Sequence, residues 1–165
     1  MNTMNIHIPS LSARYTVRRL NAADTEMIYA LCCGNPQFYE HHPPFVTRAS
    51  ILEDMTALPP GKTCDDKYFI GFLDGDTLVA VMDLIAGYPD DTTAHIGFFM
   101  MHADFQGKGV GSAIIGDVIA HLRAAGFRKI RLGVDKGNPQ SYAFWQKNGF
   151  RVASESEFII MTLEL

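Results

Sequence analysis

Hydrophobic residues recur along most of the chain with the spacing of strands that bury one face. Alternation of polar and apolar residues, or an apolar run bounded by turn residues, predicts strands at 14–20, 67–73, 77–86, 93–101, 130–134 and 158–163. The Asp74-Gly75 pair between the second and third of these segments is a strong hairpin signal. The tail contains one or two strands, of which 158–163 is the clearer.

The most regular helical pattern lies in the second half of the chain. Residues with small or apolar side chains recur there at the spacing of a buried helical face: Gly111, Ile114, Ile115, Val118, Ile119 and Leu122. Gly126 follows in the position of a left-handed helix cap. Shorter helices are predicted at 25–32, 48–58 and 138–148, from capping residues before them and glycine or proline after them. Segment 35–47 contains three prolines and is predicted to be a loop.

The order of these elements predicts the fold class. A strand at 93–101, a long helix and a strand at 130–134 form a right-handed crossover between two parallel strands. Antiparallel hairpins flank this unit. We therefore expect an α+β fold: a mixed, mostly antiparallel sheet with a central parallel strand–helix–strand crossover and helices on both faces. The length fits a single domain over 1–165.

Composition narrows the class of protein. Hydrophobic residues make up 47% and charged residues 19% of the chain, as in an ordinary globular protein. No stretch approaches the roughly 20 apolar residues of a membrane span. Residues 1–10 lack the basic start and apolar core of a signal peptide. We therefore expect a cytoplasmic location and no membrane partner.

Cysteines and histidines give no sign of a disulfide framework or of a metal site. Cys32 and Cys33 are adjacent, Cys64 stands alone, and no Cys/His pair has the spacing of zinc ligands. His41-His42 is interpreted as a solvated pair in a loop rather than as a metal ligand. The sequence therefore predicts no metal.

Charge is distributed unevenly around a net value of −4. Residues 1–100 contain 12 acidic and 6 basic side chains, whereas residues 101–165 contain 6 acidic and 8 basic ones. The net charge argues against a nucleic-acid partner. An anionic ligand suits the second half and a cationic one the first, although an uneven solvated surface explains the distribution equally well.

A glycine-rich segment between strand 93–101 and the long helix is suited to binding a phosphate. It reads Gln106-Gly107-Lys108-Gly109-Val110-Gly111-Ser112. Backbone N–H groups are free at the start of a helix, where its dipole is positive, and glycines let the backbone approach an anion closely. The nucleoside-triphosphate loop needs Lys followed by Ser or Thr, and the dinucleotide fingerprint needs a different glycine spacing in an all-parallel unit. Neither of these patterns is present.

Two motifs in order give the chain a family resemblance. The segment 106–111 resembles the acetyl-CoA motif of the GNAT N-acetyltransferase superfamily, and 98–105 resembles the strand and short loop that precede it. Residues 138–150 resemble the second signature of that family, an Asn-led helix that ends in Gly-Phe. The resemblance covers 14–165 as a succession of elements and is motif-specific over 95–150.

The resemblance implies acetyl-CoA as a co-substrate and a set of residues that bind it. The pantetheine arm would pair with backbone groups near Phe99 and Met101, and Asn138 would contact it. The pyrophosphate would lie on the glycine-rich loop: Gln106, Gly107, Lys108, Gly109, Val110, Gly111 and Ser112. Lys108 would add a charge-assisted contact, although a solvated loop lysine explains it equally well.

The resemblance also implies direct attack of an amine on the thioester, with two departures from the family. His95 occupies the position where many relatives have a glutamate base, and a hydrogen-bonded structural histidine is the alternative. His102 is a weaker candidate. Trp145 replaces the tyrosine that frequently serves as the acid, and indole cannot donate a proton there. Tyr142, one turn earlier, either substitutes for it or packs in the core.

The acceptor and the state of assembly are the least defined expectations. In the family, the region between the first two helices lines the acceptor side, which here contains Phe38, Tyr39 and Glu40. The acceptor expected is a primary amine. This aromatic wall with one carboxylate, together with the acidic first half of the chain, favours a small cationic acceptor over an anionic one. The function expected is that of an acyltransferase, with a non-catalytic acetyl-CoA-binding sensor or interaction domain as the alternative. A homodimer is left open.

Overall fold

The computed structural model describes residues 4–165, which build one seven-stranded sheet with five α-helices. The strands are β1 (Thr16–Arg19), β2 (Lys67–Asp74), β3 (Thr77–Ala86), β4 (Thr93–Met101), β5 (Lys129–Asp135), β6 (Arg151–Glu155) and β7 (Phe158–Glu164). The helices are α1 (Thr25–Cys33), α2 (Pro36–His41), α3 (Arg48–Thr56), α4 (Val110–Ala124) and α5 (Pro139–Lys147). No helix in this described part is long and apolar enough to cross a membrane.

The sheet is mixed, in the order β1-β2-β3-β4-β5-β7-β6. Its central pair, β4 and β5, is parallel and connected through α4, while the other neighbouring strands are antiparallel. This arrangement confirms the predicted α+β fold with a parallel strand–helix–strand unit at its centre. The tail forms two strands, and β6 is exposed along its whole length at the edge of the sheet.

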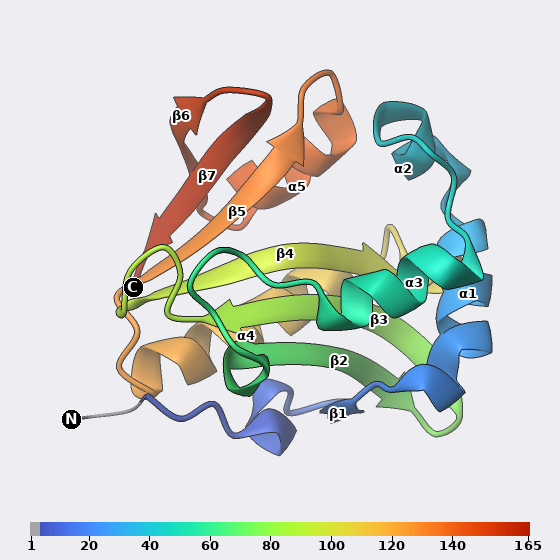
Figure 1. The fold of residues 1–165 in the computed structure, drawn as a ribbon, viewed down its shortest axis with the longest axis horizontal. Coiled ribbons are helices and arrows are strands. Elements are labelled where there is room, and N and C mark those ends of the chain that lie inside the picture. The colour runs from blue at the N-terminus through green and yellow to red at the C-terminus, as the bar shows by residue number, and fades with distance from the viewer. Residues whose placement is uncertain (1–3) are drawn as a thin grey trace.

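Hydrophobic clusters cover both faces of the sheet. The larger cluster includes the buried face of α4, formed by Ile114, Ile115, Val118 and Leu122, together with Trp145 of α5. The smaller cluster includes residues of α1 and α3 and the partly buried aromatic side chains of α2. In Figure 1, α3 crosses in front of the sheet and α4 lies behind it. The prediction of helices on both faces is confirmed.

The parallel pairing of β4 and β5 ends after four residues. Thr93 to Ile96 pair with Lys129 to Leu132, and no pairing of these strands follows. The ladder between β3 and β4 shifts at this point: Leu84 pairs with Ile96 and Asp83 with Phe98. Gly97 is therefore the extra residue of a β-bulge, which bends its strand. Beyond it the two strands diverge, with β4 held by β3 and β5 by β7 (Figure 1).

The prediction of a loop over 35–47 was wrong in part, because Pro36–His41 forms the short helix α2. Proline is well accommodated at the first helical position, where its missing N–H group would have no intrahelical partner. Pro36 stands at that position, after Asn35. Phe38 and Tyr39 pack on the smaller hydrophobic cluster and so attach this helix to the sheet.

Candidate active site

The glycine-rich loop presents a row of free backbone N–H groups at the N-terminus of α4. Gly107 and Gly109 adopt left-handed conformations, with φ of +73° and +77°. Within residues 4–165, none of the N–H groups of 107–112 donates a hydrogen bond to a protein acceptor. Consecutive free N–H groups at the positive end of a helix form an anion-binding concavity. The loop can therefore hold a phosphate group.

Two of the loop glycines serve different purposes. A Cβ atom added at Gly109 would meet no atom within 4 Å, so this residue is open to the surface of the loop. A Cβ atom added at Gly111 would lie 3.1 Å from the ring of Phe144. Gly109 thus allows the turn and the close approach of a ligand, and Gly111 allows α5 to pack closely on α4.

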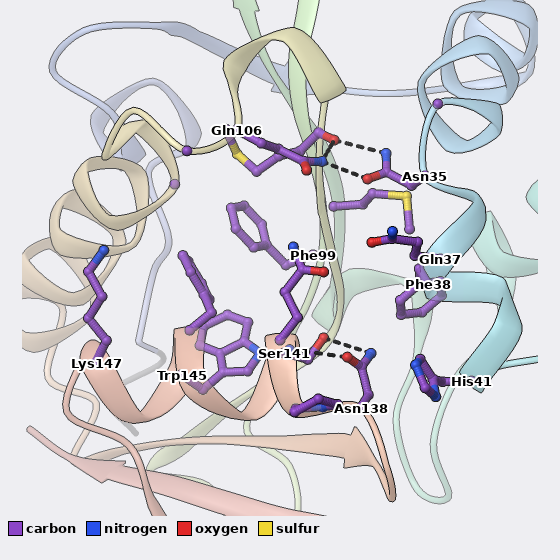
Figure 2. A pocket seen from close by; sticks show the side chains of 18 of the residues that line it. Asn35, Gln37, Phe38, His41, Phe99, Gln106, Asn138, Ser141, Trp145 and Lys147 are labelled. Carbon is purple, nitrogen blue, oxygen red and sulfur yellow. Dashed lines mark hydrogen bonds between the residues drawn. The ribbon is translucent and has the colours of Figure 1, made fainter.

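A cavity of about 760 Å³ lies between this loop, β4, α5 and α2 (Figure 2). Most of the residues predicted to bind the coenzyme line it: Phe99, Met101, Gln106, Gly107, Gly109, Gly111, Ser112 and Asn138. Lys108 and Val110 are not among the lining residues; Lys108 is exposed and Val110 is buried in the core. The cavity is large enough for a cofactor-sized molecule.

Gln106 is held by a hydrogen-bond network rather than left free to reach a ligand. Its Nε2 donates to Asn35 Oδ1 at 2.6 Å and to the Met101 carbonyl at 3.0 Å, as Figure 2 shows. Asn35 Nδ2 donates to the same carbonyl at 3.0 Å. The network ties the loop to the end of β4 and to the start of α2. Asn35 was missed in the sequence, although its position before Pro36 is a helix-start signal.

One helix carries polar side chains along one wall of the cavity. Asn138 is buried and caps α5: its Oδ1 accepts from the Ser141 N–H at 3.2 Å, and its Nδ2 donates to Ser141 Oγ at 3.0 Å. Lys147, at the other end of α5, also lines the cavity and points toward the loop side in Figure 2. Its ammonium group can reach an anionic ligand there. Apart from its charge, Lys147 had no signal in the sequence.

A second cavity, of about 320 Å³, lies where β4 and β5 diverge. It shares four lining residues with the first cavity: Phe38, Phe99, Ser141 and Trp145. The rest of its wall comes mainly from β4, β5 and β7. The two cavities therefore meet at the gap between the strands, one on the side of the glycine-rich loop and one on the side of His95 and Asp135.

His95 lines the second cavity but faces a guanidinium group. Arg131 Nη1 lies 3.1 Å from His95 Nδ1. Because a guanidinium can only donate, Nδ1 accepts, and the neutral ring then carries its hydrogen on Nε2. Burial, with a further contribution from the charge of Arg131, lowers the pKa of His95 to about 4. This geometry is unfavourable for a general base, and the base role of His95 stays a prediction.

Asp83, which the sequence reasoning missed, lies beside the bulge. Its Oδ2 accepts a hydrogen bond from Lys67 Nζ at 3.1 Å, and its Oδ1 is buried with no partner in the described chain. A Cβ atom added at Gly97, which lines the second cavity, would lie 2.9 Å from Asp83 Oδ2. Burial raises the pKa of Asp83 above the usual carboxyl range, against the opposing charge of Lys67. In the sequence, the only feature that marks Asp83 is its place as a single aspartate in an otherwise apolar strand.

The candidates for the acid lie differently with respect to the two cavities. Trp145 lines both, whereas Tyr142 lines neither and packs against the larger hydrophobic cluster. His102 also lines neither, and its Nδ1 accepts from the Asp104 N–H at 3.1 Å. The core interpretation of Tyr142 agrees with this position, and its acid role stays a prediction.

The residues predicted to form the acceptor wall are divided among three environments. Phe38 lines both cavities, and Glu40 is exposed and lines the first, on the coenzyme side. Tyr39 lines neither: its ring lies 5.1 Å from that of Phe45, and burial, with a further contribution from the neighbouring Cys32 thiol, raises the pKa of its hydroxyl. Of this wall, Phe38 alone reaches the second cavity. His42, next in the same segment, also lines that cavity.

The chain belongs to the acetyltransferase (GNAT) family, whose match covers residues 26–150. It is accordingly an acyltransferase of the GNAT N-acetyltransferase type. The glycine-rich loop and the Asn-led helix that carry the resemblance both fall within the matched residues. No curated protein matches the sequence.

Solved structures with low sequence identity share the fold. An acetyltransferase from Thermus thermophilus superimposes with a TM-score of 0.80 at 20% identity, covering 97% of this chain and 100% of that one. The PaiA N-acetyltransferase from Thermoplasma acidophilum, in complex with coenzyme A, gives 0.69 at 17% identity over 90% and 98% of the two chains. The GNAT domain of S. lividans PAT gives 0.66 at 19% identity over 92% and 90%.

Replacing Gly109 by valine tests the glycine-rich loop. A β-branched side chain is strained at φ +77° and would project into the space that a phosphate needs. We expect Gly109→Val to weaken coenzyme A binding at least about tenfold, roughly 1.4 kcal/mol, by calorimetry.

Gly61→Val is the matched control, because Gly61 has φ +80° and open space around it but lies outside both cavities. It imposes a similar backbone strain and should leave coenzyme A affinity unchanged. Equal effects of the two substitutions would show that strain, and not the loop's contact with the coenzyme, weakens binding.

Proposed function

We propose that the protein transfers the acetyl group of acetyl-CoA to a primary amine by direct attack. The observation that carries this proposal is the junction of two cavities at the gap between β4 and β5. In the reaction a nitrogen–carbon bond forms, the carbon–sulfur bond breaks, coenzyme A leaves as a thiol, and the amine loses its proton. Entry from two sides lets both reactants be bound before the bond forms.

The first cavity supports the placement of the coenzyme. The pyrophosphate would bind the free N–H groups of 107–112, with Lys147 near enough to add a charge. The pantetheine arm would run along the diverging part of β4, past Phe99 and Asn138. Backbone groups released from pairing by the divergence would then be available to the arm and to the developing oxyanion.

The second cavity supports a small acceptor whose amine is cationic at neutral pH. Its volume of about 320 Å³ suits a small molecule. Asp135 lines it while hydrogen-bonded to His42, and Asp83 lies beside the lining residue Gly97, so the surroundings of a bound ammonium group include two acidic residues. The single-domain organisation, the cytoplasmic location, the homodimer and the absence of metal and nucleic acid stay predictions.

The proton of the amine needs an acceptor, because deprotonating an alkylamine with a pKa near 10 costs roughly 4 kcal/mol at neutral pH. Asp83 is better placed for this task than His95. Its carboxylate lies beside Gly97, which lines the cavity and has no side chain, and in this proposal a water molecule at Gly97 relays the proton from the amine to it. The Nδ1 of His95 is occupied by Arg131.

Incubation with acetyl-CoA and a panel of primary amines, followed by detection of released thiol, tests the proposed function. We expect release that depends on the presence of an amine. Coenzyme A binding without release for any amine would favour the alternative, a non-catalytic acetyl-CoA-binding sensor or interaction domain.

Removing the proposed proton acceptor should slow the reaction strongly. Asp83→Asn is expected to lower kcat by about 10²-fold or more, within the range for a lost general base, and to flatten the rise of kcat/KM with pH. In the unsubstituted enzyme this rise reports deprotonation of Asp83, and it lies above the usual carboxyl range because burial raises that pKa.

Two further variants control this experiment. Lys67 is buried against Asp83, so Asp83→Asn alone leaves the Lys67 ammonium group buried without a counter-charge and can destabilise the fold. The double variant Asp83→Asn/Lys67→Met removes that charge as well. His95→Gln keeps a hydrogen-bond acceptor for Arg131 and should retain the pH profile. A normal profile in folded Asp83→Asn, with its loss in His95→Gln, would assign the base role to His95.

Tyr142→Phe tests whether the reaction needs a side-chain acid. The coenzyme A thiol should resemble cysteine, with a pKa near 8.5, so its thiolate leaves without obligatory protonation. Because Tyr142 lines neither cavity, we expect a fall in kcat of less than about tenfold, below the 10²–10⁴ of a general acid. A hundredfold fall at an unchanged melting temperature would make Tyr142 the acid.

A further inference from the structure

One cationic side chain of the second cavity has no anionic partner. Arg131 lies on β5 opposite His95 and lines this cavity. In the part of the chain that the structure describes, no carboxylate forms an ion pair with it. Arg18 and Arg48, by contrast, each pair with a carboxylate, Asp24 and Glu26 respectively. Several other arginines also lack an ion pair, but they are exposed, so Arg131 is the arginine of the described residues that combines partial burial with an unpaired charge.

The groups around Arg131 hold it in place without neutralising it. His95 Nδ1 accepts from its Nη1 at 3.1 Å, and its Cζ lies 5.7 Å from the centroid of the Tyr88 ring. Tyr88 in turn packs edge-on against His95, with ring centroids 5.5 Å apart. The neutral imidazole and the aromatic face fix the position of the guanidinium, and they leave its remaining N–H donors free for another acceptor.

The acidic residue of this cavity is engaged elsewhere. Asp135 accepts from His42 Nδ1, at 2.9 Å to Oδ1 and 3.1 Å to Oδ2. Asp135 lies four residues beyond Arg131 on β5, about 13 Å along an extended strand. Asp83 is hydrogen-bonded to Lys67. Neither carboxylate neutralises Arg131, so its guanidinium group is available to an anionic group of a ligand.

We propose that Arg131 binds a carboxylate of the acceptor, so that the acceptor is a small amino acid. This inference rests on the proposed function, because it places the acceptor in the second cavity. A guanidinium matches a carboxylate through two parallel hydrogen bonds, and desolvation makes such a pair stronger than it is in water. A single unpaired cation suits the single charge of a carboxylate better than the double charge of a phosphate.

The position of Arg131 also limits the distance between the two groups of the acceptor. It immediately precedes Leu132, which forms the last parallel pair with Ile96 before the strands diverge. The thioester is expected just beyond this pair, one or two residues along the strand, or about 3–7 Å. The guanidinium and the thioester are thus expected close to each other, which suits an acceptor whose amine and carboxylate are close together, as in a small amino acid.

Binding can be measured without turnover, because Trp145 is the sole tryptophan of the chain and lines both cavities. Its fluorescence would be followed in the coenzyme A complex during titration with matched sets: alanine, methionine and phenylalanine, their amides, and the amines that lack the carboxyl group. In at least one set, we expect the acid to bind ten times more tightly than its amide and its amine.

Substitutions at Arg131 then show whether this residue causes the preference for acids over amides. Arg131→Gln should abolish it, weakening the acid at least tenfold while changing the amide and the coenzyme A affinity less than twofold. Arg131→Lys keeps the charge but loses the planar fork, so it should retain part of the preference. This variant also serves if Arg131→Gln has a lowered melting temperature.

The inference is overturned if acids bind no better than amides, if no acid-bearing amine binds, or if Arg131→Gln weakens acids and amides equally. Selective binding of acids without acetyl transfer would contradict the proposed function and leave the carboxylate site in place. Acetyl transfer to amines without any preference for acids would support the proposed function and contradict the carboxylate site at Arg131.

Discussion

The early separation of β4 from β5 is the constraint on which the site depends. Parallel pairing stops at Ile96 and Leu132, although both strands continue. Each strand keeps its other neighbour: β5 pairs with β7 over its full length, and β4 pairs with β3 on both sides of the bulge. The gap is therefore built into the sheet and does not depend on the loops around it. Both cavities meet there.

The bulge that bends β4 is coupled to a buried charge. A side chain at Gly97 would displace the Asp83 carboxylate, because Asp83 Oδ2 would lie 2.9 Å from its Cβ atom. Lys67 stabilises the buried carboxylate of Asp83 by a hydrogen bond, and its ammonium group also donates to the Ala57 carbonyl at 2.6 Å. A buried carboxylate with an unsatisfied oxygen costs stability, and such costs are common where a site needs a particular group. The bulge therefore lies both at the start of the gap and beside the carboxylate that we propose as the base.

Much of the fold follows from local patterns in the sequence. Strand 77–86 and strand 93–101 were predicted with the bounds of β3 and β4, because alternation and the Asp74-Gly75 turn are local signals. The Asn-Pro start that predicted α5 also precedes α2, yet three prolines led to the prediction of a loop. A six-residue helix has too few turns for a periodic pattern, so its cap was the one signal available.

The glycine-rich loop was recognisable because its chemistry is local. Asn35, Asp83 and Arg131 were not, because their roles arise from partners far away in the sequence: Gln106 for the first, Gly97 for the second and His95 for the third. The base role predicted for His95 rested on the family resemblance, because His95 stands where many relatives have a glutamate. The sequence did not show that Arg131 would face it, which depends on the register of a parallel pair.

A crystal structure of the complex with coenzyme A tests the central claim most directly. Our account requires the pyrophosphate on the backbone N–H groups of 107–112. The thiol should then lie in the gap between β4 and β5, at the wall that Phe99 and Trp145 share between the two cavities. A coenzyme whose thiol lies outside this gap, with β4 and β5 closed upon each other beyond Ile96, would contradict it.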